Sequence, residues 1–441
     1  FRHEPTAEVR ISAAILRFSV IPVILTYGFT QASWVLLALP LVVFTAAALV
    51  AHGRLMLNRP EPSGLTEFYL WISIGGAAGG VFAALLAPVL FDQILEYPIA
   101  IALAVTLLPI TTSMERRARG LAVVAAGVAL VAGAVRIVGQ VDAALVLAAV
   151  AAVIAFVAFR KTAAFIIVMV VVIVGSLSGA KGTLATARTF FGVHRVFEAD
   201  PETHVIASGT TVHGLQIFGS GSPVPTGYYH LEGPVGEALA TLDDRPTLDV
   251  ALLGLGAGTL AAYSRPGDVF TFFEIDPAVV GLATNPDLFT YVSEAAGSIE
   301  FVLGDGRIML ERQDEQYDTI VMDAFGSDSI PTHLLTREAI DVYLEHLRTN
   351  GLLLIHISNR HLDLEPVLGR LADDAGLAAR VRRHTPSPGA LEEGAAPSTW
   401  VAFARSAEDL DGLTSQWQAA RVDGPLWTDS YTSLLGVFRW R

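Results

Sequence analysis

Three glycines and a carboxylate in the second half of the chain have the types and spacing of a nucleoside-binding site. Gly254, Gly256 and Gly258 follow an apolar segment. Such glycines let the backbone turn tightly out of a strand and approach a ligand closely, and residues 259–263 can then begin a helix. About twenty residues after the first glycine, Glu274 can accept hydrogen bonds from both hydroxyls of a ribose. The spacing therefore predicts a strand, a turn and a second strand that together hold a nucleoside.

Two further aspartates stand at the ends of apolar segments. Asp305 follows a third predicted strand, and Asp323 ends a fourth. Ligands of open α/β sheets bind outside the carboxyl ends of the strands, so Glu274, Asp305 and Asp323 are expected in one crevice beside the glycines. A single aspartate of this kind is more typical of a helix cap or a turn. The series of strand ends favours a binding site.

Seven short motifs occur in order from about residue 190 to the end of the chain: Val212–Gln216, Tyr228–His230, Gly254–Gly258, Glu274–Asp276, Gly304–Gly306, Asp323–Asp328 and Leu353–Asn359. Together they resemble the spermidine synthase family, the aminopropyltransferases with a methyltransferase-like Rossmann core, and most closely its membrane-fused branch. The resemblance implies a substrate, decarboxylated S-adenosylmethionine or S-adenosylmethionine itself. It also implies the residues that bind this substrate: Gln216, His230, Gly254, Gly256, Gly258, Glu274, Asp305 and Gly306.

Within that resemblance the glycines hold the methionine-derived end, Glu274 the ribose and Asp305 the adenine amino group. The implied reaction transfers an aminopropyl group to putrescine and releases methylthioadenosine. A sulfonium makes its neighbouring carbon electrophilic, so the enzyme must mainly supply a deprotonated amine held in line. Asp323 can accept a proton from the incoming ammonium and is the predicted catalytic residue, with Tyr229 and Asp328 as second choices.

The acceptor side departs from the family pattern. The acidic residue that usually follows the Tyr-His pair is Leu231 here, and the closely spaced acidic pair is stretched to Asp323 and Asp328. Putrescine is therefore in doubt as the acceptor. Two alternatives stay open. S-adenosylmethionine could undergo methyl transfer, elimination or cyclisation, or the membrane part could transport a polyamine or nucleoside, with the other domain as its sensor.

The first 180 residues have the composition of a membrane domain. The chain is 52% hydrophobic and 16% charged, with a mean hydropathy of +0.52, and its apolar residues concentrate before residue 181. A helix needs about 20 apolar residues to cross a bilayer. Seven spans are predicted, at 11–29, 31–51, 67–91, 97–113, 120–139, 142–159 and 162–180. The chain is therefore predicted to be a multi-pass protein of the cell membrane, in contact with the lipid bilayer.

Arginines in two loops bear on the orientation of these spans. The excess at 52–61 and 115–119 places both loops in the cytoplasm by the positive-inside rule, and three more spans would then leave the catalytic domain outside. S-adenosyl compounds are made in the cytoplasm, so we expect a cytoplasmic catalytic domain instead. The first ten residues are polar with both charges, so a cleavable signal peptide is not expected from them.

Charge and composition limit the classes of partner. Residues 1–181 carry a net charge of +4 and the remainder −18. An acidic domain repels nucleic acid and attracts a cationic substrate such as an amine or a sulfonium. The chain has no cysteine, which excludes disulfides and thiolate chemistry, and its histidines lack the spacing of a metal site. The family resemblance implies a homodimer.

The predicted organisation has three parts. Residues 1–181 form the transmembrane helical domain, residues 182–232 a linker and a small β-hairpin subdomain, and residues 233–441 a spermidine synthase-like Rossmann domain. The hairpin region is expected at about 190–232, after a linker at 181–191. The predicted fold class is thus a multi-pass α-helical membrane domain joined to an α/β Rossmann-like domain.

Overall fold

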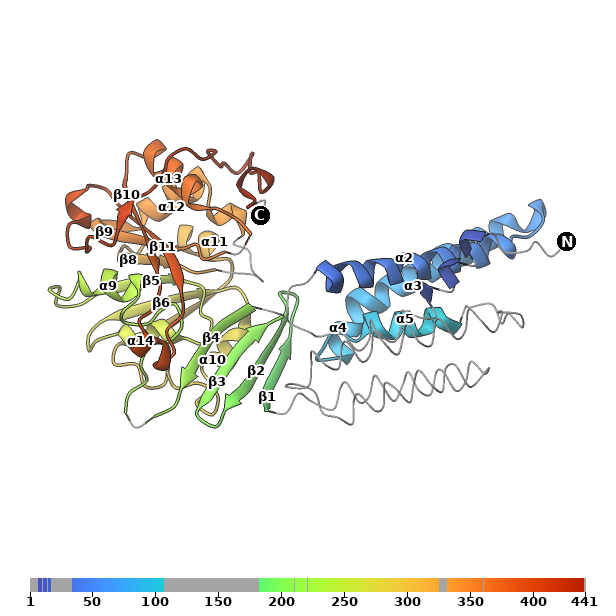
Figure 1. Ribbon diagram of the computed structural model, residues 1–441, viewed down its shortest axis with the longest axis horizontal. Coiled ribbons are helices and arrows are strands. Elements are labelled where there is room, and N and C mark those ends of the chain that lie inside the picture. The colour runs from blue at the N-terminus through green and yellow to red at the C-terminus, as the bar shows by residue number, and fades with distance from the viewer. Residues whose placement is uncertain are drawn as a thin grey trace. The chain divides into compact units, whose positions relative to one another are not determined.

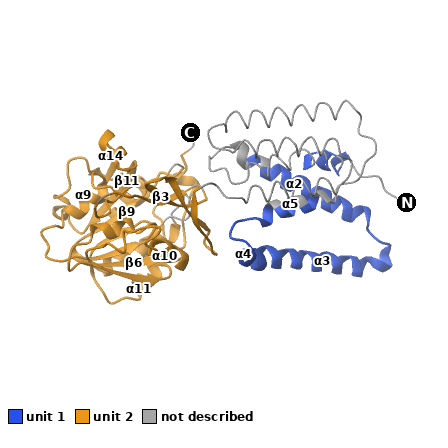
Figure 2. Ribbon diagram, turned by 90° about the horizontal axis from the view of Figure 1, so that it is seen from below, with its two compact units in different colours: residues 1–181 blue, residues 182–441 orange. Residues whose placement is uncertain are grey.

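The computed structural model describes residues 7–9, 11–13, 15–16, 34–106, 182–209, 211–219, 221–324, 331–359 and 361–439. The chain divides into two compact units, Phe1–Lys181 and Gly182–Arg441 (Figure 2). The predicted spans at 120–139, 142–159 and 162–180 lie outside the described residues, as does most of the span at 11–29.

The described part of the first unit is helical. Its elements are α2 (Trp34–Leu57), η1 (Pro62–Gly64), α3 (Leu65–Val81), the π-helical η2 (Phe82–Leu86), α4 (Ala87–Leu90) and α5 (Glu96–Thr106). Two helices, Pro40–Leu57 and Pro62–Leu90, are long and apolar enough to cross a membrane. They correspond to the predicted spans at 31–51 and 67–91. The count of seven spans stays a prediction.

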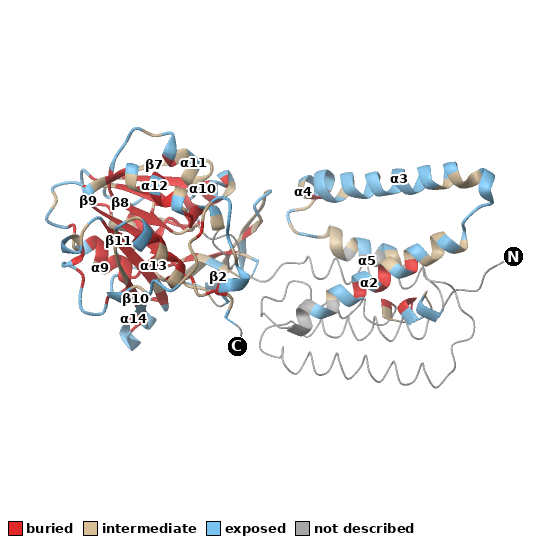
Figure 3. Cartoon of the chain, turned by 90° about the horizontal axis from the view of Figure 1, so that it is seen from above, coloured by how far each residue is buried: buried red, intermediate tan, exposed pale blue. Residues whose placement is uncertain are grey.

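The second of these helices exposes large apolar side chains. Figure 3 shows α3 mostly in the colour of exposed residues. Trp71, Leu85 and Val89 are 63%, 64% and 84% exposed. A helix that is apolar all round is typical of a protein core or of a membrane. Small residues at the spacing of the glycines at 75–80 favour close packing of helices in a membrane, but these glycines have no described atom within 4 Å of the position that a Cβ would occupy. Helix packing at these glycines is therefore not seen in the described structure.

The second unit begins with a small antiparallel sheet in the order β1-β2-β3-β4. Its strands are β1 (Thr183–Arg188), β2 (Val193–Asp200), β3 (Thr203–Ser208) and β4 (Thr211–Ile217). The prediction of a linker up to residue 191 was therefore wrong, because β1 occupies six of those residues. The sheet buries Val196 and Ile206 against Phe289 and Tyr291 of the larger domain.

The larger domain is an eight-stranded sheet in the order β12-β10-β11-β9-β8-β5-β6-β7 (Figure 1). Its strands are β5 (Asp249–Leu253), β6 (Val269–Glu274), β7 (Ser298–Leu303), β8 (Tyr317–Met322), β9 (Leu347–His356), β10 (Ala378–His384), β11 (Ser398–Ala404) and β12 (Gln418–Ala419). Strands β5 to β9 run parallel, while β10, β11 and β12 are antiparallel to their neighbours. This is a Rossmann-like sheet. Its strand order reverses between β5 and β8, and ligands of such sheets bind at this switch point.

Helices cover both faces of the sheet. They are α9 (Pro234–Ala240), α10 (Pro277–Ala283), α11 (Gly306–Glu311), α12 (Arg337–Glu345), α13 (Glu365–Asp374) and α14 (Pro388–Glu392), with 3-10 turns η3 (Thr259–Tyr263), η4 (Thr332–Leu334), η5 (Glu408–Leu410) and η6 (Leu435–Val437). Residues of α11, α12 and α13 pack on one face, and residues of α9 and α10 on the other.

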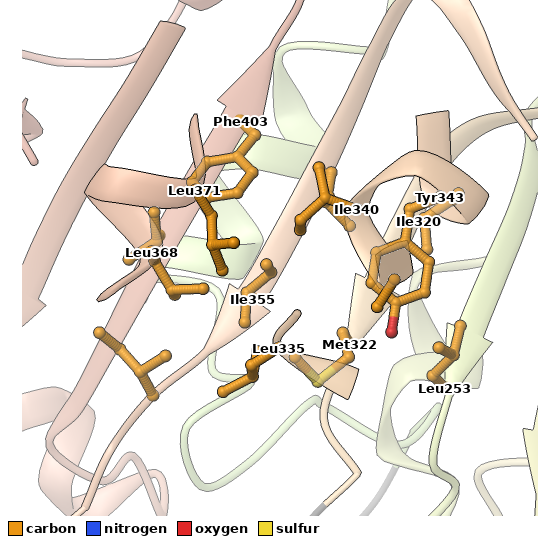
Figure 4. Close-up of a cluster of buried hydrophobic side chains, with 14 of the residues drawn as sticks. Leu253, Ile320, Met322, Leu335, Ile340, Tyr343, Ile355, Leu368, Leu371 and Phe403 are labelled. Atoms are coloured by element: carbon orange, nitrogen blue, oxygen red, sulfur yellow. The ribbon is translucent and has the colours of Figure 1, made fainter. Parts of the chain in front are cut away.

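Burial on both faces explains the apolar composition of the strands. Every residue of β8 is buried, as suits a parallel strand covered on both sides. On the face shown in Figure 4, Ile320 and Ile355 of the sheet lie among Ile340 of α12 and Leu368 of α13. These contacts fix the carboxyl ends of β8 and β9, where the candidate site lies.

The first turn after β5 differs from the expected helix. Residues Thr259–Tyr263 form a 3-10 helix and stop at Ser264. Pro266 follows two residues later, and a proline can neither continue a helix nor leave its preceding residue in helical geometry. The turn is therefore shorter than in the predicted strand–helix–strand unit.

Candidate active site

The glycine loop is shaped by close contacts within the protein. Gly254, Gly256 and Gly258 have φ angles of 102°, 57° and 81°, in the left-handed region that favours glycine. A Cβ on Gly254 would collide with the carbonyl oxygen of Asp323, and one on Gly256 with the carbonyl oxygen of His213. The loop thus lies against the end of β8 on one side and against β4 on the other.

Glu274 is hydrogen-bonded to the backbone of the glycine loop. Its two carboxylate oxygens accept hydrogen bonds from the backbone N–H of Leu255 at 3.1 Å and of Asp276 at 2.9 Å. The side chain is buried, and burial raises the pKa of Glu274. A third backbone hydrogen bond comes from Ile275. A carboxylate offers about four lone pairs, so acceptor capacity remains for a ligand after these contacts. Its place at the end of β6 is the one that the sequence predicted.

Asp276 fastens the small sheet next to Glu274. Its side chain caps α10 through the N–H of Ala278 at 2.9 Å, lies 2.9 Å from Nε2 of His194, and accepts a hydrogen bond from the hydroxyl of Thr189. The small sheet therefore reaches the carboxyl edge of the large one beside the predicted ribose partner.

Asp305 lies at the end of β7, where it begins α11. One oxygen accepts from the N–H of Ile308 at 3.1 Å, and the other lies 2.8 Å from Nε2 of His333. Gly306 is the first residue of that helix, and a Cβ there would lie 3.0 Å from the side chain of Leu253. Asp305 is thus a helix cap as well as a strand-end carboxylate, the two interpretations that its sequence position allowed.

The carboxyl-terminal segment is joined to the same helix. Arg307 donates two hydrogen bonds to Asp429, at 2.7 and 2.8 Å, and another to the carbonyl oxygen of His333 at 2.8 Å. The two bonds from Arg307 to Asp429, with a third from the hydroxyl of Thr336, lower the pKa of Asp429 to about 2. Trp427, two residues earlier, is fully buried in the core. The segment is therefore anchored by packing and by a bidentate ion pair.

Asp323 occupies the switch point with both oxygens engaged. One oxygen lies 2.7 Å from Nδ1 of His356, and the other accepts a hydrogen bond from the hydroxyl of Tyr229. Burial alone would raise the pKa of Asp323, but the charge and hydrogen bond of His356 and the Tyr229 hydroxyl outweigh burial and lower it. Burial and the negative charge of Asp323 raise the pKa of Tyr229 well above its ordinary value. Asp323 is therefore held as a carboxylate beside a protonated phenol.

His356 is enclosed by aromatic rings. Its ring stacks on Tyr228 at 4.5 Å and on Trp400 at 4.7 Å, and its Nε2 lies 2.6 Å from the hydroxyl oxygen of Ser358. Sequence reasoning did not select His356, Ser358 or Trp400 as site residues, although the first two lie in the motif Leu353–Asn359. A histidine directly after the apolar run at 352–355 of β9 was the available signal.

Two of the predicted binding residues are engaged with protein partners. The amide of Gln216 accepts from the N–H of Thr290 at 2.8 Å and donates to its hydroxyl at 2.7 Å. In His230, Nδ1 accepts from the N–H of Glu232 at 3.2 Å, so Nε2 carries the proton and donates to Glu393 at 3.2 Å. Both side chains are buried. In this structure they hold loops around the site.

The last predicted catalytic residue, Asp328, lies outside the described residues. A cavity of about 350 Å³ lies at the opposite, amino-terminal edge of the strands, lined among others by Asp249, Glu300 and Tyr317. The strand-end carboxylates are at the other edge, so this cavity is separate from the candidate active site. Within the described ranges, no group of three or more histidines and carboxylates could hold a metal ion.

Comparisons with known proteins give two sequence matches. A polyamine aminopropyltransferase of Vibrio vulnificus (strain CMCP6) is 30% identical over 110 residues, which are 24% of this chain and 36% of that protein. A probable polyamine aminopropyl transferase of Bifidobacterium longum (strain NCC 2705) is 28% identical over 156 residues, which are 35% of this chain and 33% of that protein. The chain thus spans about a third of the length of the curated relatives it matches. No model of a protein family matches the chain.

Solved structures that match this chain include a probable spermidine synthase and a spermidine synthase. A probable spermidine synthase from Corynebacterium glutamicum ATCC 13032 is 17% identical, with a TM-score of 0.41, over 58% of this chain and 99% of the other. The spermidine synthase of Thermotoga maritima is 14% identical, with a TM-score of 0.37, over 53% and 76%. Both sequence matches are to proteins named as polyamine aminopropyltransferases, and they support a spermidine synthase-like relationship for the matched part of this chain.

Proposed function

We propose that this protein is an aminopropyltransferase-like enzyme that uses decarboxylated S-adenosylmethionine, or S-adenosylmethionine itself, and releases methylthioadenosine. The observation that carries the proposal is the position of Asp323. This ionised side chain lies at the switch point of the sheet. Its backbone lies against Gly254 of the glycine loop, and Glu274 accepts a hydrogen bond from the N–H of Leu255 in the same loop. The curated relatives named as polyamine aminopropyltransferases support the same class of reaction.

The nucleoside side of the proposed site uses strand ends β5, β6 and β7. Glu274 has acceptor capacity left for the ribose hydroxyls. Gly254 and Gly256, which are only partly buried and carry no side chain, let the sulfonium end approach closely. Asp305, at the end of β7, would accept from the adenine amino group. These assignments place the reacting carbon of the nucleoside between the glycine loop and Asp323.

The chemical step needs a base and an aligned nucleophile. The amine nitrogen forms a bond to the carbon next to the sulfonium, the carbon–sulfur bond breaks, and its electron pair makes the sulfur of methylthioadenosine neutral. The proton of the amine goes to Asp323. Tyr229 lies on that carboxylate, so an incoming amine would take up part of the hydrogen bonding that the phenol provides in this structure.

Putrescine is our first choice of acceptor, and a specific observation favours a second candidate reaction. Both oxygens of Asp323 already have protein partners, and Leu231 stands where the family has an acidic residue. A site with fewer free carboxylates would suit methyl transfer, or elimination or cyclisation of S-adenosylmethionine without any amine.

Product analysis tests these proposals. The detergent-purified protein would be incubated with either nucleoside, with and without putrescine, and the products identified by mass spectrometry. Spermidine with methylthioadenosine supports the first proposal. Methylthioadenosine without an amine acceptor supports elimination or cyclisation, and S-adenosylhomocysteine supports methyl transfer. No product under any condition would refute the proposed transferase.

We also propose that the protein is anchored in the cell membrane with its Rossmann domain in the cytoplasm. The two apolar helices at Pro40–Leu57 and Pro62–Leu90, with their exposed apolar side chains, support the anchoring. Retention in the membrane fraction after alkaline carbonate washing is expected. Protease added outside intact cells should leave the Rossmann domain uncut, and cleavage there would reverse the orientation.

A further inference from the structure

We propose that His356 is a positioning residue of the active site, which orients Asp323 and sets the pH range in which it works as the base. The inference rests on the proposed function and deepens it. It assigns the base to a carboxylate–imidazole pair formed by β8 and β9 instead of a lone aspartate.

Four contacts fix the imidazole in one orientation. Nδ1 lies 2.7 Å from Asp323, Nε2 lies 2.6 Å from the hydroxyl oxygen of Ser358, and the two faces of the ring stack on Tyr228 and Trp400. The ring is 3% exposed. A ring held at both nitrogens and on both faces cannot rotate without breaking several contacts, so the direction of its bond to Asp323 is fixed.

The hydrogen-bond pattern sets which groups donate. An ionised carboxylate can only accept, so Nδ1 carries a proton and donates to Asp323. Ser358 accepts a backbone hydrogen bond from Thr399 at 2.8 Å, so its own hydroxyl proton is available for Nε2. The imidazole therefore donates one bond to Asp323, and its other nitrogen faces the hydroxyl of Ser358, which the N–H of Thr399 also holds. Ser358 and Thr399 thus support the orientation in which Nδ1 faces Asp323.

The position of the contact has a chemical consequence. His356 occupies one oxygen of Asp323 and leaves the other, the one bonded to Tyr229, as the place where a proton can arrive. The groups that face this carboxylate are Tyr229, His356 and His213, with Tyr228 next to Tyr229. His356 contributes more than His213 to holding the pKa of Asp323 low. Removing the imidazole should therefore raise the pH at which the base becomes active.

If the role of His356 were only structural, its substitution would have a different effect on activity. His356 would then fill space between Tyr228 and Trp400, and any planar ring of similar size would replace it. His356→Phe keeps the ring and its stacking but removes the donor to Asp323. His356→Asn keeps an N–H group near the position of Nδ1 but removes the ring. The two variants therefore separate hydrogen bonding from packing.

The experiment measures kcat, KM and their pH dependence for the full chain in detergent, with methylthioadenosine affinity as a check on the nucleoside site. We expect His356→Phe to lower kcat about 10- to 100-fold, the value of one hydrogen bond to a charged group. Its KM for the nucleoside should stay within about threefold, and the acid limb of kcat/KM should move up by about one pH unit. His356→Asn should recover kcat to within about tenfold of the native enzyme. Equal kcat and an unmoved acid limb in His356→Phe would overturn the proposal.

Two further measurements keep the test decisive. If His356→Phe does not fold, His356→Asn and Ser358→Ala carry the test, and an acid limb unchanged in both would overturn the proposal. If the native protein makes no product, the proposed function fails separately. The pair is then tested through binding, because a sulfonium ligand should lose affinity relative to neutral methylthioadenosine as Asp323 becomes protonated. That loss should occur at higher pH in the variants, and an identical midpoint would refute the role of His356.

Discussion

Replacing Glu274 by Gln tests the proposed nucleoside site most directly. The two carboxylate oxygens accept from different backbone groups, the N–H of Leu255 at 3.1 Å and the N–H of Asp276 at 2.9 Å. A glutamine amide has only one oxygen, so in either orientation one of these N–H groups faces an NH₂ group instead of an acceptor. The substitution also removes the negative charge proposed to bind the ribose.

The size of the effect follows from the lost contacts. A hydrogen bond to a charged group contributes about 1.5–3 kcal/mol. The amide oxygen can still accept from one ribose hydroxyl, so the loss in binding is about one such bond, which corresponds to a Kd raised about 10- to 150-fold. The unpaired N–H of the glycine loop or of Asp276 would in addition lower the free energy of unfolding by about 1–3 kcal/mol.

Isothermal titration calorimetry with methylthioadenosine measures the binding effect without any assumption about the acceptor. Glu300→Gln is the matched control, because it removes the same charge from β7 beside the cavity at the other edge of the sheet. Its Kd should stay within about twofold of the native value. Equal affinities in the two variants would refute the assignment of Glu274 to the ribose, provided that thermal unfolding shows both to be folded.

Three further predictions concern the other parts of the site. Asp323→Asn should abolish turnover while methylthioadenosine still binds, and retained turnover would remove Asp323 from the role of base. Backbone strain alone would make Gly254→Ala lower the free energy of unfolding by about 1–3 kcal/mol. The expected loss is larger, because the added Cβ also collides with the carbonyl oxygen of Asp323. Thermal unfolding of Gly376→Ala, with φ of 69° and open space around it, gives the strain alone, and equal losses would contradict the collision. Arg307→Lys should loosen the carboxyl-terminal segment, because a single hydrogen bond to Asp429 replaces a bidentate pair. Amide hydrogen exchange near Asp429 should then be faster. Unchanged exchange would mean that the packing of Trp427 alone holds this segment.

The ends of the parallel strands were readable from the sequence because their physical causes are local. A strand covered on both faces is an uninterrupted apolar run, and the first polar residue after it marks the carboxyl edge. Glu274, Asp305 and Asp323 lie at the ends of β6, β7 and β8, where the sequence placed them. The carboxylates at the carboxyl edge of the sheet could thus be identified before any contact was known.

The roles of other side chains depend on contacts between distant segments, and local patterns do not contain them. Gln216 pairs with Thr290, and His230 pairs with Glu393, 163 residues further on. The stack of His356 between Tyr228 and Trp400 likewise joins three separate segments. Strand β1 was missed for a local reason, since Thr183–Arg188 is half-buried and lacks the apolar run of the core strands.

The two sides of the candidate site are built from different parts of the sheet, and this bears on how its specificity can vary. The nucleoside side depends on β5 and β6, with Glu274 bonded to backbone groups. The acceptor side depends on Asp323 and His356 at the ends of β8 and β9, with the Tyr228–Tyr229 loop over them. The two sides are joined by the pairing of β5 with β8, and at Gly254 the absence of a side chain lets the two backbones come close at the edge of the sheet. Substitutions around His356 can therefore alter the acceptor and the base while the glycine loop and Glu274 keep their geometry. This sequence shows that combination, because its nucleoside motif follows the family pattern and its acceptor motif departs from it.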